Sequence, residues 1–140
     1  MKIAMACDHG GFHLKEHIKK YLEDKGIEVV DHGTHSEDSV DYPDYAAKLC
    51  EDITSGASGA QKGILICGTG IGISIAANKC KGIRAALCGD VFSAKMSREH
   101  NNANVLCMGE RVLGVGLAEM ITDAWLETEF AGGRHERRVN

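Results

Sequence analysis

The sequence predicts one α/β domain, a three-layer α/β/α sandwich in which helices cover both faces of a five-stranded parallel sheet. Short apolar runs alternate with longer segments whose apolar residues recur every three or four positions, as when strands alternate with helices. The apolar runs are continuous, which is typical of strands buried on both faces. A length of 140 residues suits a single domain, spanning residues 1–140.

Five apolar runs have the length and composition of buried strands. They are residues 3–7, 28–31, 63–67, 83–87 and 105–108. Because helices separate them, we expect right-handed crossovers and parallel strands. For five strands in a chain of this size, the sequence predicts a Rossmann/flavodoxin-like sheet with strand order 2-1-3-4-5.

The first helix is predicted between the first two strands, because Leu14, Ile18 and Leu22 share one helical face. Its end is expected at residues 25–26, where a lysine is followed by a glycine. Residues 32–43 are polar and are interpreted mainly as a loop.

The second helix is predicted to begin near Pro43, because proline is favoured in the first helical turn. It should end before residues 55–59, which are rich in serine and glycine. Three further helices are predicted over residues 73–78, 91–100 and 113–125. From Gly132 onward the chain is polar and is interpreted as a tail.

Composition excludes several classes of protein. With 20 acidic and 16 basic residues the net charge is −4, which argues against a general nucleic-acid binder. No apolar run approaches the ~20 residues of a membrane span, and no signal peptide is recognised, so we expect a cytoplasmic protein without membrane contact. The six cysteines include no Cys-x-x-Cys pair, which favours free thiols over disulfides or a zinc site.

The predicted strand order brings two distant segments together. Ligands of such sheets bind beyond the carboxyl ends of the strands, where the order reverses. Asp8 and His9 follow the first strand, and Cys67 ends the third. Cys67 also precedes a turn into a helix, whose N-terminus would stabilise a thiolate able to act as base or nucleophile. The alternative is a small buried hydrophobic residue.

The turn after Cys67 is rich in glycine. Gly68, Gly70 and Gly72 would let backbone N–H groups point at an anion. A tight turn without a ligand is one alternative. A nucleotide- or flavin-binding turn is another, although Ile73 stands where the dinucleotide motif needs a small residue.

Other candidates have two interpretations each. Asp8 is either an N-cap or a catalytic group, and His9 is a phosphate ligand, a proton carrier or a loop residue. His100 either interacts with a helix C-terminus or acts as a general acid or base. The arginines at 134, 137 and 138 form either a solvated end or a clamp for an anion. A phospho-receiver domain is disfavoured because Cys67 stands where it needs an aspartate.

Several motifs together are similar to a known family. They are residues 8–11, 41–43, 63–79, 97–101 and 132–135. Over essentially its whole length the chain resembles the ribose-5-phosphate isomerase B family, which also holds galactose-6-phosphate and allose-6-phosphate isomerase subunits. The resemblance implies interconversion of ribose 5-phosphate and ribulose 5-phosphate through an enediolate, without metal or organic cofactor. An isomerase of a six-carbon sugar phosphate, such as allose 6-phosphate, is the alternative.

The resemblance also implies roles for single residues. The implied catalytic residues are Asp8, Cys67, Thr69 and His100. The implied substrate-binding residues are His9, Tyr42, Gly68, Gly70, Ile71, Gly72, Ser74, Asn101, Arg111, Arg134 and Arg138. Cys67 would be the base that moves the proton between carbons 1 and 2, because Ile73 replaces the glutamate of the other subtype.

Finally, the resemblance implies a homodimer, alone or paired into a tetramer, with the site at the subunit interface. His100, Asn101 and the tail arginines would then be divided between subunits relative to Cys67. The tail, residues 132–140, would contribute to the site, and Arg137 would remain on the surface.

Overall fold

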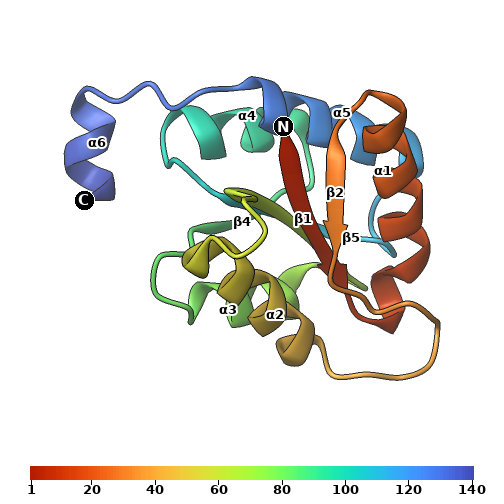
Figure 1. Cartoon of the computed structure of the whole chain (residues 1–140). Coiled ribbons are helices and arrows are strands. Elements are labelled where there is room, and N and C mark those ends of the chain that lie inside the picture. The colour runs from red at the N-terminus through yellow and green to blue at the C-terminus, as the bar shows by residue number, and fades with distance from the viewer.

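The apolar runs form one parallel sheet of five strands in the computed structural model, which describes residues 1–140 (Figure 1). The strands are β1 (Lys2–Cys7), β2 (Glu28–Asp31), β3 (Lys62–Cys67), β4 (Ala85–Leu87) and β5 (Val105–Gly109). The helices are η1 (His9–Gly11, a 3-10 turn), α1 (Phe12–Asp24), α2 (Tyr42–Ser55), α3 (Ile71–Asn78), α4 (Val91–Glu99), α5 (Val115–Glu127) and α6 (Arg134–Val139). The predicted strands and the five long helices are therefore confirmed to within a few residues.

Helices cover both faces of the sheet. On one face, α1, α4 and α5 pack through residues such as Ile18, Ala94 and Trp125. On the other face, α2 and α3 pack through residues such as Leu49 and Ile73. The predicted three-layer sandwich is confirmed, and the buried apolar side chains of the central strands β1, β3 and β5 are divided between the two cores.

The order of the last two strands differs from the prediction. The sheet has the order β2-β1-β3-β5-β4, so the predicted order 2-1-3-4-5 is wrong at its end. All of β5 is buried, whereas β4 has three residues that are partly or fully exposed. A short and less apolar strand is more stable at the edge of a sheet than in its centre.

This order places β5 beside β3. Cys67 is paired with Gly109 across the two strands. The N–H of Arg111 donates to the carbonyl of Gly68 at 3.0 Å. Arg111 therefore lies beside the glycine-rich turn, which the predicted order would have separated from β5 by another strand.

The C-terminal segment also differs from the prediction of a simple tail. Residues Arg134–Val139 form the helix α6, none of whose residues is buried. Because it buries no apolar face, it has no apolar periodicity by which the sequence could reveal it. Glu136 in its first turn and basic residues in its last turn complement the helix dipole.

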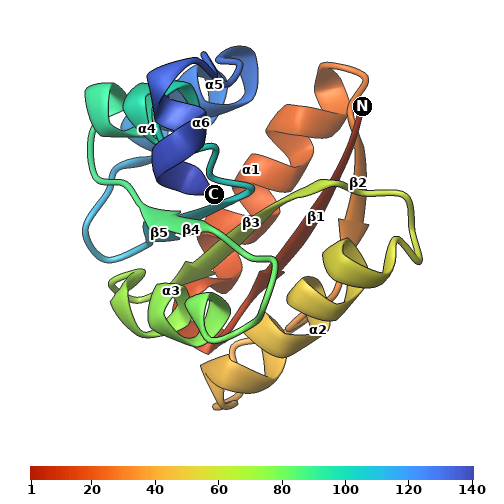
Figure 2. The same cartoon turned by 90° about the vertical axis from the view of Figure 1, so that its left-hand side faces the viewer.

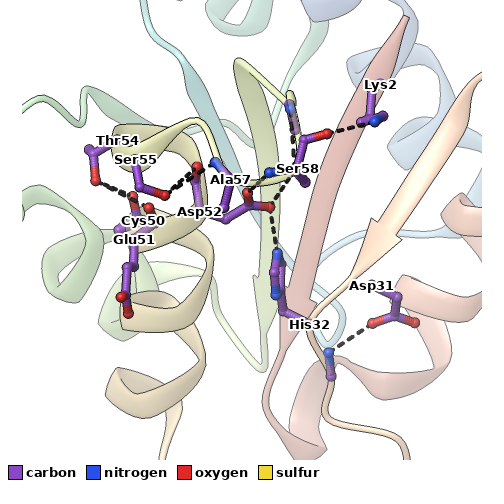
Figure 3. A network of polar contacts seen from close by, with 12 residues as sticks. Lys2, Asp31, His32, Cys50, Glu51, Asp52, Thr54, Ser55, Ala57 and Ser58 are labelled. Carbon is purple, nitrogen blue, oxygen red and sulfur yellow. Dashed lines mark hydrogen bonds and ion pairs between the residues drawn. The ribbon is translucent and has the colours of Figure 1, made fainter.

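A polar network ties α2 to the neighbouring strands (Figure 3). Asp52 accepts hydrogen bonds from Ser58 N and Oγ at 2.9 and 2.7 Å and contacts His32 Nε2 at 2.7 Å. Burial acts to raise the pKa of Asp52, but the bonds with His32 and Ser58 outweigh it and lower that pKa. Lys2 Nζ donates to the Ser58 carbonyl at 2.6 Å, so the network fixes the loop that leads into β3.

The structure contains no helix with both the length and the apolar character needed to cross a membrane.

Candidate active site

The turns after β1 and β3 touch each other at the carboxyl edge of the sheet. A Cβ atom added at Gly10 would lie 3.1 Å from the backbone nitrogen of Gly68. The N–H of Asp8 donates to the carbonyl of Ile66 at 3.3 Å. The segments containing Asp8 and Cys67 are therefore neighbours, as the sequence predicts.

Cys67 differs from the other cysteines in its hydrogen bond. It ends β3, is 5% exposed, and its sulfur accepts the N–H of Gly70 at 3.1 Å. The thiols that instead face backbone carbonyl oxygens are those of Cys7, Cys50, Cys80 and Cys88. A backbone N–H stabilises negative charge on sulfur, whereas burial raises the pKa of Cys7 and Cys50 to about 12. Cys67 is thus the cysteine whose sulfur accepts a backbone N–H.

Gly70 shapes the turn that presents this N–H. Its φ is 81°, a left-handed conformation that favours glycine. A Cβ atom at this position would lie 2.5 Å from Leu87 Cδ1 and 2.9 Å from the carbonyl carbon of Met108. The turn is therefore held tightly between α3 and the ends of β4 and β5.

The first turn of α3 leaves backbone donors free. The N–H of Ile71 donates to Thr69 Oγ1 at 3.1 Å, and that of Ser74 donates to the Gly70 carbonyl at 3.2 Å. The N–H groups of Gly72 and Ile73 have no acceptor within the chain. Together with the helix dipole, these two groups form a site for a developing negative charge next to Cys67.

Asp8 and His9 have defined orientations. Asp8 is 8% exposed, and its Oδ1 accepts the N–H of Gly10 at 2.9 Å as the N-cap of η1. The N–H of Val40 donates to His9 Nδ1 at 3.2 Å. In the neutral ring the proton is therefore on Nε2, which is available as a donor to an anion.

Tyr42, from the start of α2, and Arg111, from the segment after β5, pack against the glycine-rich turn. A Cβ atom at Gly72 would lie 2.8 Å from Tyr42 Cζ, and one at Gly68 would lie 3.4 Å from Arg111 Nη1. An aromatic ring and a guanidinium group thus border the same turn. We call Asp8, His9, Tyr42, Arg111 and residues 67–74 the Cys67 group.

A buried ion pair supports the loop that reaches His9. Lys15 is fully buried, and its Nζ lies 2.8 and 2.7 Å from the two carboxylate oxygens of Asp31. Burial acts to raise the pKa of Asp31, but Lys15 and the N–H of Gly33 lower it below its usual value. Sequence reasoning misses this pair, because a lysine next to Leu14 is expected at the surface, whereas Lys15 lies on the inward face of α1.

The remaining predicted residues lie elsewhere: His100, Asn101, Arg134 and Arg138. We call these four the His100 group. Helix α4 starts after β4 and runs back, so His100, its C-cap, lies near the start of β5. The five residues of β5 separate the amino and carboxyl ends of the strands by about 15 Å.

The His100 group is held together at that opposite end of the strands. The rings of His100 and His135 are stacked, with centroids 4.2 Å apart, which joins α4 to α6. In Figure 1, α6 lies at the upper left, whereas β1 points to the lower right. Within one chain, the members of each group are therefore close to one another, but the Cys67 group and the His100 group lie apart.

Comparison with known proteins identifies the family. Residues 3–140 match the family described as Ribose/Galactose Isomerase. The chain belongs to this family. As a ribose/galactose isomerase it is an aldose–ketose isomerase, and the resemblance stated from its motifs is confirmed.

Individual relatives span almost the whole chain. Ribose-5-phosphate isomerase B of Escherichia coli (strain K12) is 53% identical over 138 residues, which cover 99% of this chain and 91% of the relative. The structure of ribose-5-phosphate isomerase B from Clostridium thermocellum has a TM-score of 0.96 and 56% identity, covering 99% and 93% of the two chains. The enzyme from Mycoplasma genitalium, solved with bound ribulose-5-phosphate, has a TM-score of 0.92 and 40% identity, covering 99% and 91%.

Proposed function

We propose that this ribose/galactose isomerase interconverts ribose 5-phosphate and ribulose 5-phosphate, with Cys67 as the base. The observation that carries the proposal is the hydrogen bond from Gly70 N–H to the Cys67 sulfur at 3.1 Å, beside the free N–H groups of Gly72 and Ile73. The named activity of the Escherichia coli relative and the ligand of the Mycoplasma genitalium enzyme support the choice of sugar.

The chemistry needs a base and a site for negative charge. The Cys67 thiolate removes the proton from C2 of the open-chain aldose, the C–H electron pair forms the C1=C2 bond, and the carbonyl electron pair moves to O1. The N–H groups of Gly72 and Ile73 stabilise the resulting enediolate. The thiol then returns the proton to C1, and a second proton moves from O2 to O1 through Asp8 or Thr69.

The phosphate needs cationic partners and donors. On the Cys67 side these are Arg111 and the Nε2–H of His9, and on the other side Arg134 and Arg138. His100 opens the sugar ring by moving a proton between the ring oxygen and O1, and Asn101 holds sugar hydroxyls. The His100 group must therefore approach Cys67.

A second copy of the chain supplies this approach. A two-fold axis perpendicular to the strands reverses the strand direction of the second subunit. It can therefore bring the carboxyl ends of the strands in one subunit close to the amino ends of the strands in the other. Figure 2 shows α3, β4, α4 and α6 gathered at the flank opposite β2. Large apolar side chains are exposed on this flank, with Ile75 57% and Phe92 72% exposed. We therefore place the dimer contact at this flank, with two identical sites, each made by the Cys67 group of one subunit and the His100 group of the other.

Two measurements test the proposal. In a panel of ribose 5-phosphate, allose 6-phosphate and galactose 6-phosphate, ribose 5-phosphate should have the highest kcat/KM; preference for a six-carbon sugar would reassign the substrate. Dimers that combine one Cys67→Ala chain and one His100→Ala chain should contain one intact site. They should regain roughly half of the wild-type activity, and inactive hybrids would refute the shared site.

A further inference from the structure

The turn that carries His100 and Asn101 has an uncommon backbone. Asn102 has a φ of 49°, in the left-handed region that few residues other than glycine adopt. The turn is closed by the N–H of Asn102, which donates to the Arg98 carbonyl at 3.2 Å, and by that of Ala103, which donates to the Ser97 carbonyl at 2.9 Å. Asparagine is among the few such residues that adopt it, and these two backbone bonds fix the turn around it.

Arg98 is the side chain that holds this turn. It is 6% exposed. Its Nη1 donates to Asn102 Oδ1 at 3.0 Å and to the Ala103 carbonyl at 2.7 Å. Its Nε donates to the carbonyl of Thr128, the C-cap of α5, at 3.2 Å. One planar guanidinium group thus connects the turn after α4 with the segment that leads to α6.

A second bond completes this connection. The N–H of Ala131 donates to the Glu99 carbonyl at 3.0 Å. The segment that leads from α5 to α6 is therefore bonded to α4 at two residues, Thr128 and Ala131, on either side of residues 129–130. The stacking of His135 on His100 then links the first turn of α6 to the same place.

The partners of Arg98 indicate a geometric role. Its guanidinium group forms no ion pair, and its acceptors are carbonyl and amide oxygens. Burial lowers the pKa of this guanidinium. A buried charge without an anionic partner is unfavourable compared with an apolar side chain. What an apolar residue cannot supply is a rigid fork that binds acceptors from two segments at fixed angles.

We propose that Arg98 is the positioning residue of the His100 group. It sets the turn that presents His100 and Asn101 and the point from which α6, with Arg134 and Arg138, leaves the body of the subunit. The four residues are thereby presented to the partner subunit as one unit. The proposal rests on the proposed function, because that function is what gives the His100 group its part in the site.

The first test compares single variants in the homodimer. Arg98→Met retains apolar bulk but no donor, and kcat/KM should fall about 100-fold, the cost of a displacement of about 1 Å in a catalytic group. Arg98→Lys should fall between Arg98→Met and wild type, because an ammonium group cannot match the fork. The exposed Arg137→Met of α6 is the matched control and should resemble wild type. Near-normal kcat/KM for Arg98→Met would overturn the proposal.

The second test shows where the defect lies. A hybrid of Arg98→Met and Cys67→Ala chains contains one site with an intact Cys67 group and an intact His100 group, and should regain roughly half of the wild-type activity. A hybrid of Arg98→Met and His100→Ala chains contains no such site and should be no more active than the Arg98→Met homodimer. General misfolding of the variant would leave both hybrids inactive and would overturn the proposal. If Arg98→Met does not yield folded dimers, Arg98→Lys takes its place in both hybrids.

The same experiment separates this proposal from the proposed function. If the Cys67→Ala and His100→Ala hybrid is active but the Arg98→Met and Cys67→Ala hybrid is not, only the role of Arg98 is wrong. If the Cys67→Ala and His100→Ala hybrid is inactive, the shared site itself fails, and with it the role of Arg98.

Discussion

The Cys67 group and the His100 group are built in contrasting ways. Asp8, Cys67 and Ser74 are each no more than 8% exposed, and their turns are pressed against each other and against the ends of β4 and β5. In the His100 group, α6 buries no residue, and one ring stack and the bonds of Arg98 hold it. If the proposed function holds, proton transfer takes place in the closely packed group, whereas ring opening depends on the exposed group that a partner subunit would present.

The largest effect is expected at the base of the Cys67 group. Cys67→Ala should lower kcat by about 10³-fold, because general base catalysis contributes about that much, while ribose 5-phosphate still binds. Turnover and calorimetric binding measure the two effects, with Cys80→Ala, outside the site, as control. Near-normal turnover of Cys67→Ala would remove it from the proton transfer.

The next largest effect is expected at the flank that should join the two groups. Phe92→Asp places a charge at a residue that is 72% exposed in one chain and that the proposed symmetric dimer would bury once in each subunit. Losing the burial of two such side chains should weaken dimerisation by about 10²- to 10⁴-fold. Sedimentation at several concentrations, together with activity, measures this. Dimers of unchanged affinity would place the contact on another surface.

A smaller effect is expected in the His100 group. Arg134→Ala should raise KM for ribose 5-phosphate about 10-fold with a lesser change in kcat, because a charge-assisted bond to the phosphate is lost. Arg137→Ala on the same helix is the control. An unchanged KM would show that Arg134 does not bind the phosphate.

The smallest effect on turnover is expected from the ion pair beneath the Cys67 group. The folded-state pKa of Asp31 is lowered, so its stabilisation is complete above the unfolded pKa of about 3.9 and is lost as the pH falls through the folded value. Asp31→Asn should therefore flatten the decline of unfolding free energy below pH 5. At pH 7 it should lower that free energy by about 2 kcal/mol, since the buried Lys15 keeps only one carboxylate partner, Glu16 at 3.1 Å.

Denaturant titrations between pH 2 and pH 7 measure this dependence. Asp24→Asn is the control, because the only ion pair of Asp24, with Lys20, is exposed on the surface. A variant Asp31→Asn with the acid dependence of wild type would contradict the assignment.

Much of the Cys67 group follows from local sequence. A continuous apolar run ending in Cys67 and followed by three glycines within five residues predicts a strand, a turn and a helix N-terminus. The bond from Gly70 to the sulfur and the free donors of Gly72 and Ile73 depend on backbone angles, which the composition alone does not set. The sequence does not reveal the roles of Arg98 and Lys15, because a buried cation is indistinguishable there from a surface residue.

The alternation of short apolar runs with helical periodicity was enough to predict the strands and the five long helices. It also predicted that Asp8 and Cys67 meet, because they lie at the carboxyl ends of two adjacent central strands. Only the tertiary structure decided that β5 lies between β3 and β4, with β4 at the edge of the sheet. This order brings Arg111 to Gly68. The tertiary structure also decided that residues 134–139 are helical. It also places His100 and Cys67 at opposite ends of the strands within one chain, in keeping with what the family resemblance implies. The physical reason is that strand order at a sheet edge depends on competition for burial between β4 and β5, and residue periodicity records burial along a segment but not which segment lies next to it.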